Sequence, residues 1–419
     1  MIKINLNHKE LYSFYEKEII PAIRCIDKTS NQCFDKIFLK FVKAHLKKDD
    51  CLDWNEFIHD LLLLSPINLF KKYSFISEFC RFVLFCHVYS DSKKIKQFCS
   101  NFLKIYSSNN LDSILVKDSF LKSIRQEINS NYIYIYISRK IIKNNYLKKD
   151  TLDLHSLVTY MNQFYTEAQR INFYLNNKIK NIIGYSILES KDLRKKLYKL
   201  FNIRICPYCN QQYIFSVNKN SYLGDFDHFI PKAIFPLFAL SLWNLVPCCK
   251  TCNQVFKGQK LLAILNPHFK GFDDNFGLNI DYQDVKSIIG LSLNFDVHFT
   301  WFAPPLSNKA NIPPVSPIKL FYEALFMEHS DCIEENNVTC FELDEIYSNH
   351  KEEISEFLRK KNMLFDLELF EKCSKNLKNN CLLYDLLSEE KLLFGVSLDS
   401  NKFQNEILSK ALYDVFFKN

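Results

Sequence analysis

Cys206-Pro207-Tyr208-Cys209 and Cys249-Lys250-Thr251-Cys252 are the stretches that decide the centre of this fold. Each holds two cysteines separated by two residues, and 39 residues lie between Cys209 and Cys249. Four thiolates at this spacing can close a tetrahedral zinc site, which is structural because no coordination position stays open. With fifteen cysteines in the chain, about 0.5 such pairs would arise by chance. Two pairs in one short window therefore predict a Zn²⁺ site, the alternative being four buried cysteines without metal.

The residues between and after these pairs carry a second pattern. Between the pairs lie Asp225-Phe226-Asp227-His228-Phe229-Ile230-Pro231-Lys232 and Leu242-Trp243-Asn244-Leu245-Val246-Pro247, and Asn253 follows the last cysteine. This order resembles that of the HNH (His-Me finger) endonucleases, which have a ββα-metal core. The two cysteine pairs resemble the zinc knuckle of junction-resolving endonucleases in the same superfamily. The resemblance covers residues 203–270, about a sixth of the chain.

The resemblance implies a role for each residue of the pattern. His228 corresponds to the general base, and a neutral imidazole near pH 7 can take a proton from water. Asp227 and Asn253 correspond to ligands of a catalytic Mg²⁺ or Mn²⁺, which prefers oxygen donors. Asn244 corresponds to the residue that pins the loop carrying the base. Asp227 and His228 can reach one site only if their strand ends or bulges there, because successive strand side chains point to opposite faces. Pro231, shortly afterwards, fits a strand that ends.

Simpler interpretations of the same residues stay open. The Asp-His pair could form a surface turn, Asn244 a turn, and Asn253 a helix cap. His268 stands where many relatives have Tyr; it is either an imidazole near the metal or, in the favoured interpretation, a packed loop residue. We also expect contacts with nucleic acid from four basic residues, although isolated cations are usually only solvated: Arg194, Lys195, Lys232 and Lys257.

Working outward, the chain is predicted to be α+β, mostly helical, with the ββα-metal core at its centre. We expect four regions: a basic helical domain (1–200), the nuclease core (201–270), a loop- and strand-rich connection (271–318) with a strand near 297–302, and an acidic helical region (319–419). Tyr and Ile alternate over residues 132–137, which is typical of a strand, and one apolar stripe over 343–358 is typical of a helix.

Charge and composition limit the function classes. Residues 1–200 carry a net charge of +13 and residues 301–419 a net charge of −7, so a polyanion partner would bind the first part. Seven glycines form no glycine-rich dinucleotide, P-loop or nucleophile-elbow motif. No apolar run is long enough for a signal peptide or a membrane span. We therefore expect a cytoplasmic protein without membrane contact, with reduced thiols.

The sequence thus predicts a metal-dependent HNH endonuclease that cleaves nucleic acid, DNA rather than RNA. The chain, with an HNH core between larger helical regions, also resembles nuclease subunits of Septu-like bacterial anti-phage defence systems. This resemblance implies a partner ATPase. Two alternatives remain: an RNA (tRNA) endonuclease with the same core, and a non-catalytic zinc module that binds nucleic acid or protein.

Overall fold

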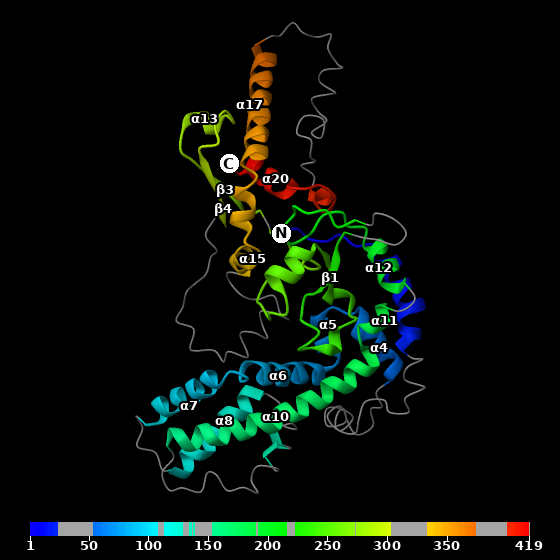
Figure 1. Ribbon diagram of the computed structural model, residues 1–419, viewed down its shortest axis with the longest axis vertical. Helices are drawn as coiled ribbons and strands as arrows, with labels where there is room; N and C mark the ends of the chain where they lie inside the picture. The colour runs from blue at the N-terminus through cyan, green and yellow to red at the C-terminus, as the bar shows by residue number, and fades with distance from the viewer. Residues whose placement is uncertain are drawn as a thin grey trace.

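The computed structural model describes residues 1–23, 53–107, 113–128, 134–135, 137–138, 153–189, 192–215, 223–272, 274–302, 333–373 and 400–418 (Figure 1). Within these ranges the protein is mostly helical and has two small antiparallel sheets, which confirms the predicted α+β class.

The described residues before residue 202 are mostly helical, as the sequence predicts. α10 begins where the Asp153 side chain accepts a hydrogen bond from the Ser156 amide at 2.8 Å, and it packs along α6 and α7 in the lower part of Figure 1. The helices are α1 (His8–Phe14), η1 (Tyr15–Ile19), α4 (Trp54–Leu63), α5 (Pro66–Lys72), α6 (Ser74–Val88), α7 (Ser92–Ser107), α8 (Ser113–Ile128), α10 (Leu154–Ile183), α11 (Ser186–Glu189) and α12 (Leu193–Phe201).

A two-stranded hairpin followed by a helix forms the centre of the molecule. β1 (Asp225–His228) pairs antiparallel with β2 (Leu245–Cys248), with Asp225 opposite Cys248 and His228 opposite Leu245. The helical turns η4 (Pro236–Phe238) and η5 (Leu242–Asn244) lie in the connection, and η6 (Thr251–Lys257) follows β2. Because β1 ends at His228, the prediction of a strand end at this point is confirmed.

The rest of the chain adds a second hairpin and more helices. β3 (Phe276–Tyr282) and β4 (Phe295–Trp301) pair antiparallel and are joined through α13 (Val285–Ile288), so the strand predicted near 297–302 is confirmed. The predicted helix over 343–358 is instead two helices, α16 (Leu343–Ser348) and α17 (Lys351–Cys373). The remaining elements are α15 (Ile333–Phe341), η7 (Ser400–Asn405) and α20 (Ser409–Phe417).

The buried apolar residues form one connected cluster that extends from Met1 to Val415. All four predicted regions contribute to this cluster, so in the described residues they share a core. Among the described residues, no helix is both long and apolar enough to cross a membrane.

The strand prediction for residues 132–137 is wrong where the structure describes them. Tyr134, Ile135 and Ile137 are helical, and the Tyr134 ring packs against Phe164 of α10, with the ring centroids 5.8 Å apart. Alternating Tyr and Ile offers no polar position, so periodicity cannot separate a strand from a buried helix, and packing decides.

Candidate active site and metal centre

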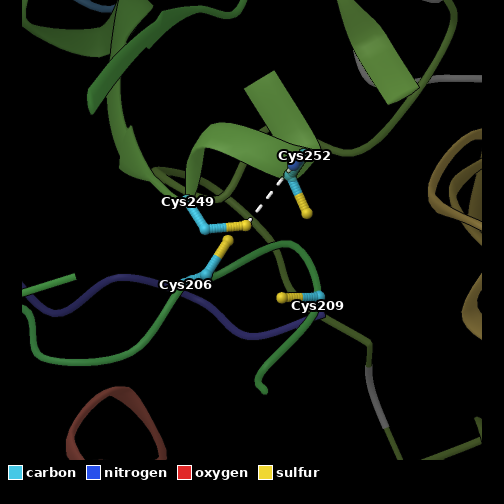
Figure 2. A group of neighbouring side chains, drawn as sticks. All are labelled: Cys206, Cys209, Cys249 and Cys252. Atoms are coloured by element: carbon cyan, nitrogen blue, oxygen red, sulfur yellow. Dashed lines mark hydrogen bonds between the residues drawn. The ribbon is translucent and has the colours of Figure 1, made fainter. Parts of the chain in front are cut away.

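The four cysteines of the two pairs converge, as Figure 2 shows. Cys206 and Cys209 come from the loop after α12, whereas Cys249 and Cys252 come from the junction of β2 and η6. All four are buried, and their sulfur atoms lie within 4.8 Å of one another. Sulfurs bound to one tetrahedral Zn²⁺ at about 2.3 Å would be roughly 3.8 Å apart, so the cluster has the right composition and nearly the right size for a zinc ion.

The electrostatics of the cluster also favour a cation. Burial raises the pKa of the Cys206 thiol well above its usual value, whereas hydrogen bonds from the neighbouring thiols lower the pKa of Cys209 well below it. A cation bound among the four sulfurs would favour their deprotonated form.

The C-terminal residues hold the first cysteine pair in place. Asn210 follows Cys209 in the left-handed conformation (φ 51°), and its side-chain amide donates to the carbonyl of Phe403 at 3.2 Å. The Tyr347 hydroxyl donates to the Cys209 carbonyl at 2.9 Å. The acidic helical region therefore packs against the four-cysteine cluster and supports it.

His228, at the end of β1, is held by a hydrogen bond from one of its ring nitrogens. Its Nε2 lies 3.1 Å from the carbonyl oxygen of Ala239. A carbonyl only accepts hydrogen bonds, so Nε2 carries the proton of the neutral ring and Nδ1 keeps a lone pair. Burial, helped by the positive charge of Lys232, lowers the pKa of His228 to about 3. The imidazole is therefore neutral at pH 7.

Asn244 makes the hydrogen bonds expected of a residue that pins the loop after the base. Its Oδ1 accepts from the Ile230 amide at 2.7 Å, and its Nδ2 donates to the carbonyls of Ile230 at 3.1 Å and Phe238 at 2.9 Å. Asn244 is fully buried, so water cannot replace these partners. Both ends of the connection between β1 and β2 are thereby fixed to one side chain.

Asp227 is engaged by two side chains. The Tyr208 hydroxyl donates to its Oδ2 at 2.7 Å, and Lys257 Nζ donates to its Oδ1 at 2.8 Å. Lys257 also donates to the His228 carbonyl at 2.8 Å, and it is only 1 % exposed. Lys257, for which the sequence predicts a contact with nucleic acid, is thus buried against Asp227 in this structure.

The remaining residues of the HNH-like pattern lie around one pocket, which Asp227 and His228 also line. Asn253, in η6, donates from Nδ2 to the Phe226 carbonyl at 3.5 Å, which ties the helix to β1. Arg194, from α12, donates to Asp225. The pocket has a volume of about 830 Å³, and its lining includes Arg194, Asp225, Asp227, His228, Lys232 and Asn253.

Lys195 and His268, like Asn244 and Lys257, are not part of this lining. Lys195 is half-buried on α12 and does not line the pocket. His268 Nε2 donates to the Leu245 carbonyl at 3.0 Å, and the ring packs against that of Phe201, with the centroids 5.9 Å apart. This environment matches the packed loop residue rather than an imidazole of the pocket.

Sequence reasoning missed Tyr185 and overlooked Tyr208. Gly184 ends α10, where a Cβ atom would lie 2.2 Å from the Lys180 carbonyl, and the chain then turns so that the Tyr185 ring meets His228 edge-on at 4.7 Å. Lys232 Nζ lies 3.7 Å from the centroid of the same ring. The only signal in the sequence was the glycine after a long helical pattern.

The pocket residues fit one weakly held divalent cation. A carboxylate has about four lone-pair positions, and Asp227 uses two of them. Mg²⁺ needs only one or two carboxylates when phosphate and water complete its shell. Among the described residues, however, the only group of three or more Cys, His, Asp or Glu side chains close enough to hold a metal is the four-cysteine cluster.

Comparisons of this chain with protein-family models, curated proteins and solved structures give no match.

Proposed function

We propose that this protein is a metal-dependent endonuclease of the HNH type, which hydrolyses phosphodiester bonds of nucleic acid. The observation that carries the proposal is the His228 imidazole. It is neutral, its Nε2 is fixed on the Ala239 carbonyl, and it lines a pocket with cationic side chains. Such a group can deprotonate water beside a phosphate.

Each neighbouring residue has a part in this reaction. Asn244 positions His228 by fixing the loop that follows it. Asp227 and Asn253 would hold Mg²⁺ or Mn²⁺, which would stabilise charge on the phosphate. Lys232, exposed at the pocket, and Arg194 would attract the phosphate. The four cysteines would hold a structural Zn²⁺ that fixes η6, and with it Asn253, relative to β1.

DNA is the favoured substrate on the family resemblance, and RNA such as tRNA is the alternative with the same core. The test is a panel of plasmid DNA, single-stranded DNA and tRNA, each with Mg²⁺ or Mn²⁺. We expect cleavage of at least one substrate, and His228→Ala should lower its rate by about 10²–10⁴-fold.

The control variant is His298→Ala, which removes a partly exposed histidine on β4 away from the pocket. It should cleave at the wild-type rate. Full activity of His228→Ala, with the same zinc content and thermal unfolding as wild type, would reject His228 as the base.

A non-catalytic zinc module is the rival function. It would bind nucleic acid or protein without needing Asp227, His228 or Asn253, and would show no cleavage by the wild type under any condition of the panel. The ordered hydrogen bonds of His228 and Asn244 favour the enzyme, since a binding module has no need of a fixed imidazole tautomer.

A role in anti-phage defence with a partner ATPase belongs to the same proposal, as does a cytoplasmic location, where thiols stay reduced for zinc. Deleting the acidic region would remove the contacts of Asn210 and Tyr347, so charge reversal is the sharper test. Glu352→Lys with Glu353→Lys, both exposed on α17, should weaken capture of the ATPase if this face docks it. Unchanged capture would exclude this face.

A further inference from the structure

The carboxylate of Asp227 is neutralised within the protein. Lys257 Nζ lies 2.8 Å from Asp227 Oδ1, and the two side chains are 1 % and 2 % exposed. A buried ammonium at hydrogen-bond distance from a buried carboxylate forms an ion pair without net charge. Lys257 is held there by its second bond, to the His228 carbonyl.

The same holds for the second carboxylate of β1. Asp225 lies on the same strand face as Asp227, two residues earlier, and is paired with Arg194. Around the pocket, four cations face three carboxylates while His228 is neutral: Lys180, Arg194, Lys232 and Lys257 against Glu189, Asp225 and Asp227. The surroundings are thus slightly positive, which attracts phosphate and opposes a bare divalent cation.

We propose that the divalent cation enters this pocket only together with a phosphate group, and that Lys257 keeps the cation out of the free protein. This inference rests on the proposed function, since it concerns the metal of that reaction. The phosphate brings the negative charge that the Asp227–Lys257 pair lacks, and Mg²⁺ commonly takes substrate phosphates and waters as most of its ligands. Lys257 acts through Asp227 and is a positioning residue.

The test measures Mn²⁺ binding to zinc-loaded protein by electron paramagnetic resonance. Mn²⁺ prefers oxygen ligands and will not replace Zn²⁺ among thiolates. Wild type should bind Mn²⁺ weakly, and thymidine 3′,5′-bisphosphate, a small phosphate donor, should tighten this binding by roughly tenfold or more. Without the bisphosphate, Lys257→Gln should bind Mn²⁺ more tightly than wild type by a similar factor. The reason is that no buried cation then neutralises the charge of Asp227.

Two further variants make the result specific. Lys260→Gln removes an exposed cation that does not line the pocket and makes no bond to Asp227, so its Mn²⁺ affinity should change by about twofold at most. The double variant Lys257→Gln/Asp227→Asn should lose the gain. Should Lys257→Gln fail to fold, as judged by circular dichroism and zinc content, Lys257→Met replaces it, since its side chain fills the same buried space.

Tight Mn²⁺ binding by the free wild type, equal to that of Lys257→Gln, would overturn the inference, as would no binding by any variant with the bisphosphate present. Failure of the proposed function looks different: the Mn²⁺ titrations would depend on Lys257 as described, but no nucleic acid would be cut.

Discussion

The four-cysteine cluster and the His228 pocket share the β1–β2–η6 unit, yet they are built in opposite ways. The cluster is closed: four like ligands, all buried, face one point. The pocket is open, and two of its carboxylates, Asp225 and Asp227, are already paired with cations of the protein. The four cysteines can by themselves hold one metal ion, whereas we propose that the pocket takes up its cation only together with a phosphate group. Tyr208, inside the first cysteine pair and bonded to Asp227, connects them.

Removing one ligand of the closed site should have the largest effect. Cys206→Ser should lower bound zinc from one ion per chain to almost none and lower the unfolding temperature by roughly 10 °C or more, because a structural zinc site contributes to folding directly. Metal analysis and calorimetry measure both. Cys248→Ala, next to the cluster but outside it, is the control and should keep its zinc. A zinc-bound Cys206→Ser would contradict the four-ligand site.

A substitution that affects only the His228 pocket should destabilise the protein less than the loss of a cysteine. Asn244→Ala removes three hydrogen bonds of a fully buried side chain, which should lower the free energy of unfolding by about 3 kcal/mol and reduce cleavage, with zinc retained. Urea denaturation gives the stability. Asn349→Ala, at an exposed helix end, should change neither quantity. If Asn244→Ala also lost its zinc, the two sites would not be separable.

The hydrogen bond from Tyr208 to Asp227, which connects the two sites, can be removed by itself. Tyr208→Phe removes only the hydroxyl that donates to Asp227, so we expect a loss of about 2 kcal/mol, typical of a hydrogen bond to a charged group, with one zinc per chain. Tyr213→Phe, at a half-exposed ring, serves as control in the same denaturation experiment. An equally stable Tyr208→Phe would mean that this bond does not couple the two sites.

Lowering the pH should destabilise the protein through His268, which contacts β2, and this is the smallest effect that we expect. Burial lowers the pKa of His268 to about 4, so between pH 6.5 and 4 the unfolded chain binds a proton that the folded chain does not. The free energy of unfolding therefore decreases as the pH is lowered, by about 1 kcal/mol between pH 6.5 and pH 5.5 for this group. His268→Phe should flatten the measured slope by that amount, whereas Phe417→Leu, at an exposed ring that does not titrate, should keep the wild-type slope. If His268→Phe kept the wild-type slope, a group other than His268 would be the cause of the acid sensitivity.

The sequence predicted the features that depend on neighbours along the chain. The cysteine spacing indicated the cluster, and Pro231 after the Asp-His pair indicated that the strand ends at His228. The position of Asn244 indicated its bonds to the loop. In each case the residues that interact are close in sequence, or their spacing is itself the constraint.

Features that depend on distant packing could not be predicted. Tyr185 meets His228 only because α10 and α11 lie beside β1, and the burial of Lys257 depends on where η6 packs. The clamp of residues 403–410 on Asn210 joins positions about 200 apart in the chain. Nothing in the local pattern distinguishes these residues from the many other tyrosines, lysines and asparagines.

Chemical rescue of His228→Gly tests the central claim most directly, because it replaces the imidazole without changing the rest of the site. Cleavage of the substrate found in the panel would be followed with and without added imidazole. We predict that the variant is inactive, that it keeps its zinc, and that imidazole restores part of the rate. Wild-type cleavage by His228→Gly in the absence of imidazole would contradict the account.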